Sequence, residues 1–176
     1  GLDPKGLKDQ YADYQKLNYD HAMINYSYAV ENPKAYKAYG KDFWGLTASY
    51  SRNENGSTGY NAHMPGNDVG VVSPTAAISS IVYTPKESIA FIRNLYENYP
   101  DSWGLAGFYD ALSPHYNWTA KWYLAIDQGP EVVMLENYRS GLIWKLFMNA
   151  PEIQQGLKKL GFTTSKYPQK GRKVVK

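Results

Sequence analysis

The residues of this chain best suited to chemistry are carboxylates, and the clearest of them is Asp127 in the run Ile126-Asp127-Gln128-Gly129-Pro130. Pro130 suits the first position of a helix, where its missing N–H needs no partner, so the sequence predicts a helix from Pro130 to about Asn149. Asp127 would then lie at the N-terminal mouth of that helix, where the dipole stabilises a carboxylate by roughly 0.3–1 kcal/mol. An ionised carboxylate held in this way is a competent general base. The alternative interpretation is that Asp127 only caps the helix.

Aromatic side chains are the second chemical feature, because the chain has 17 Tyr and 5 Trp, many in segments rich in Gly, Asn, Ser and Pro. In a polar loop such a side chain offers an apolar face and a hydrogen-bonding edge, which suits a sugar ring. The stretch 41–72 is irregular and carries such residues throughout, which indicates a functional loop, the alternative being a disordered linker. A second irregular stretch covers 101–117. We expect segments 44–69 and 103–118 to lie at the same end of the helices and to face one cleft.

The elements that must position these residues are helices. Apolar residues at spacings of three and four predict a first helix that begins at Asp3-Pro4 and ends before Asn32-Pro33. Further helices are expected after Ser73-Pro74, after Thr84-Pro85 and from Pro151, so the sequence predicts an all-α chain of about six helices with long aromatic-rich loops. The core candidates on the central helix are Val132, Val133, Leu135, Leu142, Ile143, Leu146 and Phe147.

Composition narrows the class of protein. With 176 residues, of which 43% are hydrophobic and 20% charged, the chain fits one domain, expected over residues 1–162, followed by a basic tail over 163–176. The five basic residues of that tail turn a formal net charge of −2 for the rest into +3 for the chain, which argues against a nucleic-acid partner. No apolar run is long enough for a membrane span, and the first residues lack a signal-peptide pattern. There is no cysteine, and the three histidines have no metal-ligand spacing, so we expect no metal and no cofactor.

Several blocks of sequence, in unbroken order, carry a family resemblance. They are Trp44-Gly45-Leu46-Thr47-Ala48-Ser49, Gly59-Tyr60, His63-Met64-Pro65-Gly66-Asn67-Asp68-Val69-Gly70, Ser73-Pro74-Thr75-Ala76-Ala77, Trp103-Gly104 with Gly107-Phe108-Tyr109-Asp110-Ala111, Ile126-Asp127-Gln128-Gly129-Pro130, and Glu136-Asn137-Tyr138-Arg139-Ser140-Gly141. Together they resemble the bacterial glucoamylase-like family. That family includes endo-β-1,2-glucanases and is similar to the glucan-processing domain of cyclic β-1,2-glucan synthases.

The resemblance implies an (α/α)₆ toroid, in which twelve helices form two rings around an active cleft. This chain supplies only about six, so it resembles the C-terminal half of such a domain, with the N-terminal half as its expected partner. The family's proton donor, a glutamate, would then lie in that other half. The resemblance also implies a periplasmic or secreted protein that binds a glucan.

Glycoside hydrolysis requires a carboxylic acid near the leaving oxygen and, for inversion, a carboxylate about 6.5–9.5 Å away that activates water. By position and by resemblance, Asp127 is the candidate base of an inverting hydrolase acting on a β-1,2-glucan. Asp68 and Asp110 are further candidates, expected to hold sugar hydroxyls or loop backbone. The remaining candidates for the walls of sugar subsites are Trp44, Tyr60, His63, Trp103, His115 and Trp118.

Three other functions are compatible with the residues. The first is a carbohydrate-binding module that uses the aromatic side chains and does no chemistry. The second is a glucoamylase that acts on an α-glucan. The third is a helical adaptor, which would have no affinity for sugar.

Overall fold

The computed structural model describes residues 2–3, 14–161 and 163–164. Most of this part is helical. The helices are α1 (Tyr14–Glu31), α2 (Pro74–Ile78), α3 (Pro85–Asn98), α4 (Ala125–Arg139), α5 (Leu142–Met148) and α6 (Pro151–Lys159), with short 3₁₀ turns η1 (Pro65–Asn67) and η2 (Pro100–Ser102). The expected number of helices is therefore confirmed for the described part of the chain. None of these helices is long and apolar enough to cross a membrane.

Short strands make the all-α prediction wrong in part. Four two-stranded antiparallel sheets pair β2 (Ala48–Arg52) with β3 (Thr58–Ala62), β4 (Trp103–Gly104) with β5 (Gly107–Phe108), β6 (Ala111–Ser113) with β7 (Trp118–Ala120), and β1 (Leu2–Asp3) with β8 (Thr163–Thr164). In β2, buried and half-buried positions alternate as in a strand, but the buried positions are Ser49 and Ser51 rather than apolar residues. A hydrophobic period of two is therefore missing from the sequence, which is why the pattern predicts a loop.

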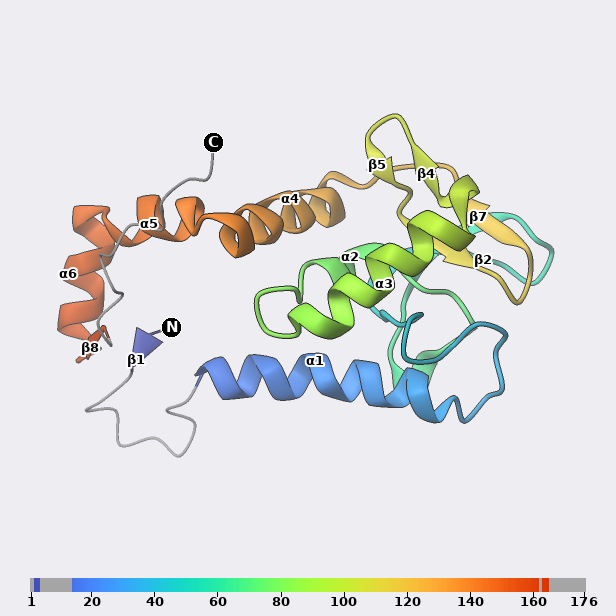
Figure 1. Ribbon diagram of the computed structural model, residues 1–176, viewed down its shortest axis with the longest axis horizontal. Coiled ribbons are helices and arrows are strands. Elements are labelled where there is room, and N and C mark those ends of the chain that lie inside the picture. The colour runs from blue at the N-terminus through green and yellow to red at the C-terminus, as the bar shows by residue number, and fades with distance from the viewer. Residues whose placement is uncertain (1, 4–13, 162, 165–176) are drawn as a thin grey trace.

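The two irregular stretches lie together, as expected. Figure 1 shows β2, β4, β5 and β7 gathered at one end of the helices, with α5 and α6 at the other end. Strand β2 contacts both β6 and β7. Val72 and Leu112 also exchange a pair of backbone hydrogen bonds of 2.9 Å each, which joins the end of the first stretch to the second.

The core lies behind these strands and is largely aromatic. Phe43, Trp44 and Phe91 are fully buried, and the rings of Phe43 and Trp44 lie 6.1 and 6.4 Å from the ring of Phe91. Because Phe91 belongs to α3, these contacts fasten the loop that follows α1 onto α3. The loops therefore rest on a rigid base, as expected of segments that carry function.

The structure corrects the predicted central helix at both ends. Helix α4 begins at Ala125, not at Pro130, and its N-cap position is Leu124. Asp127 is thus within the first turn of the helix and does not occupy the N-cap position, which removes the capping interpretation. At the other end α4 stops at Arg139, because Gly141 adopts a left-handed conformation (φ 69°) that ends one helix and begins α5.

Other helix boundaries follow the sequence more closely. Helix α1 ends at Glu31, immediately before Asn32-Pro33, and its expected N-terminal portion lies outside the described residues. Helices α3 and α6 begin at Pro85 and Pro151, as predicted from proline at a first helical position. Apart from β8, the expected basic tail also lies outside the described residues.

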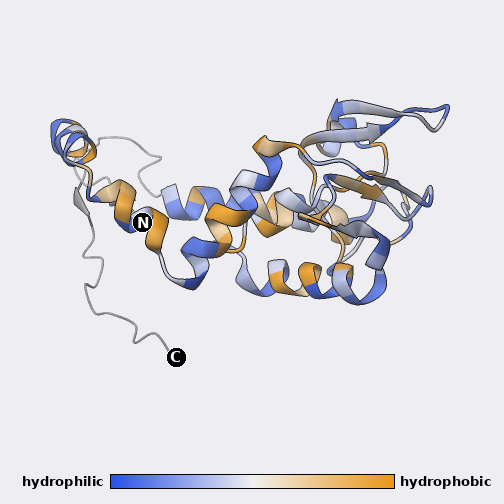
Figure 2. Ribbon diagram, turned by 90° about the horizontal axis from the view of Figure 1, so that it is seen from above, coloured by the Kyte–Doolittle hydropathy of each residue, from blue (hydrophilic) through white to orange (hydrophobic). Residues whose placement is uncertain are grey.

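The apolar face of α4 and α5 is exposed, although its residues were predicted to be core. Val132 is 68% exposed, and α5 has no buried residue. Figure 2 shows hydrophobic stretches of ribbon on the helices that lie away from the sheets. An open apolar groove of about 720 Å³ runs between α3 and these helices. We call this surface the apolar face; its members include Ile89, Ile92, Val132, Val133, Leu135, Tyr138 and Ile143.

An exposed face of this kind predicts self-association of the chain by itself, since monomers seldom expose apolar patches beyond a few hundred Å². We expect the purified chain to sediment as a species larger than 19.9 kDa and to bind a hydrophobic dye. The double substitution Val132→Gln, Leu146→Gln should reduce both signals. Leu105→Gln is the matched control, because Leu105 is fully exposed but lies in the β4–β5 turn. A dispersed monomer that does not bind the dye would contradict this prediction.

Candidate active site

Asp127 is held by the residues around it in the helix. The Thr75 hydroxyl of α2 donates a 2.7 Å hydrogen bond to the Asp127 carbonyl. The side-chain amide of Gln128 donates a 3.1 Å bond to the Phe108 carbonyl of β5. The first turn of α4 is therefore bonded both to α2 and to the strands. These bonds fix the backbone from which the Asp127 side chain extends, and Asp127 is 8% exposed.

Asp110 directly precedes β6 and is 1% exposed. Its Oδ2 accepts a 2.7 Å hydrogen bond from the backbone N–H of Tyr50 in β2. Its own N–H donates to the Trp122 carbonyl at 3.1 Å, and its carbonyl accepts a 2.6 Å bond from the Ser73 hydroxyl. Three segments distant in sequence therefore meet at this residue.

Gly45 allows one of these segments to approach. Its φ is +134°, and a Cβ at this position would lie 2.9 Å from the Ser73 carbonyl oxygen. The Gly45 carbonyl accepts a 3.0 Å hydrogen bond from the Ser73 N–H. A larger residue would force Ser73 away, and with it the hydroxyl that holds Asp110.

The carboxyl groups of Asp110 and Asp127 interact directly. Asp110 Oδ1 and Asp127 Oδ2 are both buried, and no donor group among the described residues reaches either atom. Two carboxylate oxygens form a hydrogen bond only if one carries a proton. The pKa of Asp110 is raised to about 7: burial contributes most, the hydrogen bond with Asp127 and its charge act in the same direction, and the Tyr50 N–H opposes the shift.

Glu131 is a third member of this group, and the sequence analysis did not identify it. It lies one turn after Asp127 on α4, so both side chains occupy the same side of the helix, and it is 8% exposed. Burial raises its pKa to about 8, with further contributions from the charges of Asp127 and Asp110. The i, i+4 spacing would have revealed it, but a helix expected to start at Pro130 left Asp127 outside that spacing.

We call Asp110, Asp127 and Glu131 the carboxyl cluster. Among the described residues, no Lys, Arg or His side chain forms an ion pair or hydrogen bond with any of the three. The pKa values of Asp110 and Glu131 are raised to about 7 and about 8, so both groups keep their protons at lower pH. The cluster therefore places the Asp127 carboxyl group beside two acids that are neutral in that range.

Asp68 has a different environment, apart from the cluster. Its carboxylate accepts hydrogen bonds from the hydroxyls of Tyr28 (3.0 Å) and Tyr39 (2.8 Å) and from the N–H of Gly70 (2.9 Å), and it is 2% exposed. Lys34 donates to its carbonyl oxygen at 2.7 Å. Of the two roles expected for it, these bonds match the holding of loop backbone.

Two of the predicted sugar-contacting residues are buried. Trp44 is a core residue whose ring packs edge-on against Tyr26, with 5.7 Å between centroids, so it does not form an accessible wall in this chain. His63 is 3% exposed, and neither of its ring nitrogens has a hydrogen-bond partner in the part of the chain that the structure describes. Burial lowers the pKa of His63, which favours the neutral ring.

Other predicted residues are accessible. Tyr60 on β3 and Trp103 on β4 are more than half exposed, and the Trp103 ring is braced edge-on by Phe108 at 4.7 Å. His115 is exposed and accepts a 3.2 Å hydrogen bond from the Lys37 N–H. Trp122, which the sequence analysis did not select, is 63% exposed, and its carbonyl bonds to Asp110. Trp122 is therefore the exposed aromatic residue linked by a direct bond to the cluster.

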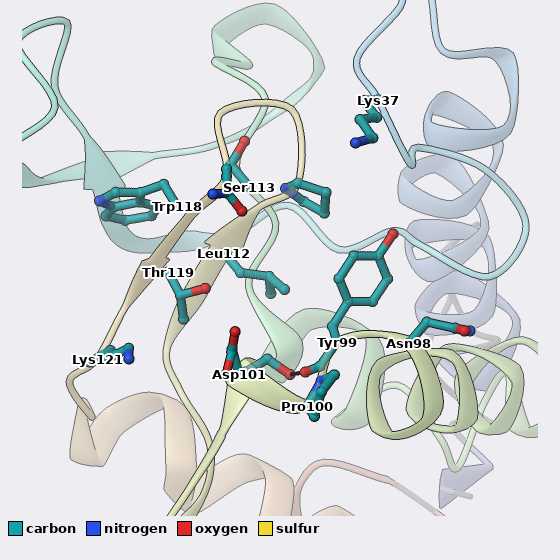
Figure 3. A pocket seen from close by; sticks show the side chains of 13 residues that line it. Lys37, Asn98, Tyr99, Pro100, Asp101, Leu112, Ser113, Trp118, Thr119 and Lys121 are labelled. Carbon is teal, nitrogen blue, oxygen red and sulfur yellow. Dashed lines mark hydrogen bonds between the residues drawn. The ribbon is translucent and has the colours of Figure 1, made fainter.

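Trp118 faces a separate hollow. Figure 3 shows it on the β6–β7 hairpin opposite Tyr99 and Asn98, around a pocket of about 670 Å³. Asp110, Asp127 and Glu131 do not line this pocket. The structure thus brings Asp110 and Asp127 together, whereas Asp68 and Trp118 lie elsewhere.

Comparison with known proteins relates this geometry to a family. Residues 1–151 match the glycoamylase family model, which is described as "Putative glucoamylase". The chain belongs to this family. Both aspartates of the cluster and Glu131 lie within the matched region.

Relatives of known activity act on β-1,2-glucans. The chain is 41% identical over 163 residues to an exo β-1,2-glucooligosaccharide sophorohydrolase of Parabacteroides distasonis, which covers 91% of this chain and 22% of that protein. It is 55% identical to the structure of an endo-β-1,2-glucanase from Chitinophaga pinensis in complex with sophorotriose and glucose, with a TM-score of 0.81. A β-1,2-glucanase structure from Parabacteroides distasonis is 40% identical, with a TM-score of 0.79.

This glycoamylase-family chain spans less than half the length of these relatives. The match with the Chitinophaga pinensis structure includes 93% of this chain and 39% of that structure's chain. The match with the Parabacteroides distasonis structure includes 92% of this chain and 23% of that structure's chain. The rest of each relative has no counterpart in this chain.

Asp68 provides a test of a structural role. Asp68→Asn removes the charge that three donors converge on, so we expect the free energy of unfolding to fall by about 1.5–3 kcal/mol. Urea unfolding followed by tryptophan fluorescence measures this change. Asp101→Asn, at an exposed aspartate of η2, should change stability by less than about 0.5 kcal/mol. Equal effects of the two substitutions would contradict the assignment.

The raised pKa values of Asp110 and Glu131 predict a pH-dependent stability. Folding favours the protonated form of each group, so the stabilisation is complete below pH 4 or so and is lost as the pH rises toward about 7 for Asp110 and about 8 for Glu131. The free energy of unfolding should therefore fall between pH 5 and pH 8, by at most about 1.4 kcal/mol per pH unit for each group. Glu131→Gln should flatten this slope, whereas Glu152→Gln, at an exposed site on α6, should leave it unchanged.

Proposed function

We propose that this chain supplies part of the catalytic domain of a glycoside hydrolase that cleaves β-1,2-linked glucan, with Asp127 as the base. The observation that carries the proposal is the carboxyl cluster, in which the buried carboxyl group of Asp127 interacts with that of Asp110, and Asp110 and Glu131 have raised pKa values. The activities of the relatives support the reaction class and the linkage.

Inversion is the stereochemistry that we propose. In an inverting hydrolase the base accepts a proton from water while that water attacks the anomeric carbon, and a carboxylic acid protonates the leaving oxygen from the other side of the sugar. Asp127 suits the first role because it is tied down at its backbone and retains a partly open edge. The proton donor is proposed to be a glutamate of the domain's remaining part.

The substrate is proposed to rest on the exposed aromatic residues near the cluster. Trp122 is attached to Asp110 through its carbonyl, and Tyr60 and Trp103 extend from the neighbouring hairpins. Each offers a flat apolar surface to a sugar ring, with polar groups at its edge. Sugar rings on both sides of the scissile bond would then be held by stacking, which positions that bond relative to Asp127.

The missing part of the domain is proposed to cover the apolar face. Half of an (α/α)₆ toroid would expose the sides of its helices that face the other half, and α4 and α5 have that character. The length of the relatives supports this interpretation, because they continue well beyond the matched segment. The apolar face would then become core, as its sequence pattern predicts.

A chimera tests the proposed function directly. This chain would replace the matching 39% of the Chitinophaga pinensis endo-β-1,2-glucanase, to which it is 55% identical. We expect the chimera to release reducing ends from β-1,2-glucan and not from an α-glucan such as maltooligosaccharide. Binding of sophorotriose without hydrolysis would favour a carbohydrate-binding module, and hydrolysis of the α-glucan would favour a glucoamylase. Absence of sugar affinity in a folded chimera would favour the adaptor.

Asp127→Asn separates catalysis from structure in that chimera. The amide keeps the size of the side chain, and its oxygen still accepts a hydrogen bond from protonated Asp110, but it is not a base. Turnover should fall by about 10²–10⁴-fold, with sugar binding nearly intact and a stability change of about 1 kcal/mol or less. Asp42→Asn, at an exposed aspartate outside the cluster, is the matched control. An Asp127→Asn chimera with turnover within about threefold of the parent would remove Asp127 from the mechanism.

A further inference from the structure

Every polar atom of Asp110 except one forms a hydrogen bond with another described residue. The backbone N–H and carbonyl are bonded to Trp122 and Ser73, and Oδ2 accepts the Tyr50 N–H. The remaining atom, Oδ1, is buried and has no donor among residues 2–3, 14–161 and 163–164, and the same holds for Oδ2 of Asp127. A buried acceptor without a donor is costly, and two of them in contact would also repel each other if both groups were charged.

We propose that Asp110 is a positioning residue of the active site: it keeps its proton and donates it through Oδ1 to Asp127, which fixes the direction of the Asp127 carboxylate. A single proton thereby satisfies both buried oxygens. The inference rests on the proposed function only for what Asp127 then does, since the shared proton is a property of the folded chain itself.

Of the groups that face Asp110, the two acids of α4 favour retention of this proton and one backbone N–H opposes it. Helix α4 presents the acids Asp127 and Glu131, and β2 presents the Tyr50 N–H, the one group that favours the charged form. Helix α2 contributes the Thr75 hydroxyl, which is occupied by the Asp127 carbonyl, and Ser73, just before it, is occupied by the Asp110 carbonyl. No cation among the described residues is paired with the cluster, so nothing there compensates a second negative charge.

The Asp110 proton gives the site a pH limit. The pKa of Asp110, raised by burial and by Asp127, is about 7, so above that pH the donor is lost and two carboxylates face each other. Asp127 would then turn away from the direction that serves catalysis. An asparagine at position 110 would donate an N–H at every pH and could still accept the Tyr50 N–H through its oxygen.

The first test observes the proton in the full chain without any assay of activity. Carbon-13 NMR of labelled aspartate carboxyl groups, titrated from pH 4 to pH 9, should show one signal with a midpoint near 7 that is absent from Asp110→Asn. In Asp127→Asn the same signal should titrate at a lower pH, because the neighbouring charge is gone. An Asp110 signal with an ordinary midpoint, or one unmoved by Asp127→Asn, would overturn the proposal even if the chimera is active.

The second test measures the pH profile of turnover in the chimera. Asp110→Asn should retain most of the parent's turnover at pH 6 and should lose the decline centred near pH 7, because its donor does not titrate. Asp110→Leu, which has no donor, should lose up to about 10²-fold at all pH values, as expected when a catalytic group is misdirected by about 1 Å. If Asp110→Leu does not fold, the pH profile of Asp110→Asn, compared with that of the parent, tests the positioning role.

A pH profile of Asp110→Asn identical to that of the parent, or a folded Asp110→Leu as active as Asp110→Asn, would contradict the positioning role. These outcomes are distinct from failure of the proposed function, in which the chimera would not hydrolyse β-1,2-glucan although the NMR titration would still report the shared proton.

Discussion

Two acidic side chains, Asp110 and Asp127, are buried against each other with no cation paired to them in the described part of the chain, and much of the surrounding structure follows from that contact. Two buried carboxylates would repel each other, so the contact is stable only with a proton between them and with both backbones held in place. The backbone bonds from Tyr50 and Ser73 to Asp110, and from Thr75 to Asp127, provide that support. The hairpins and α2 are thus required by the chemistry of α4, although they lie far from it in sequence.

The chain satisfies its polar groups at one end and leaves apolar surface at the other. Around the strands, loops rich in Gly, Asn and Ser are closed by internal hydrogen bonds, and Asp68 is the clearest example, with two tyrosine hydroxyls and a backbone N–H on its carboxylate. On α4 and α5 the same chain exposes Val132, Leu146 and Phe147. This asymmetry supports the proposal that further polypeptide covers the apolar face, since monomers seldom expose apolar patches of this kind.

Parts of the site and fold were predictable from local pattern. Proline at a first helical position located the starts of α3 and α6, and Asn32-Pro33 located the end of α1. Asp127 and Asp110 were both named as candidates from their blocks of sequence. Glu131 was missed for a specific reason: Pro130 was interpreted as the start of the helix, yet α4 contains it, so the one-turn spacing from Asp127 to Glu131 was not recognised. The strands were missed because the buried positions of β2 include serines, which give no hydrophobic alternation.

By itself, the sequence determined the features that depend on neighbours along the chain. These are the helix starts at Pro85 and Pro151, the end of α1 before Asn32-Pro33, the aromatic character of the loops, and the apolar stripe of α4 and α5, since backbone conformation and periodicity are local properties. The tertiary structure decided the features that depend on burial. It assigned Trp44 to the core and left Trp122 exposed, made Asp68 a loop anchor, and brought Asp110 to Asp127. The pKa of a carboxyl group depends on its burial and on nearby charges. Asp110 is buried and lies against Asp127 only when β2, the start of β6 and α4 pack together in the folded chain.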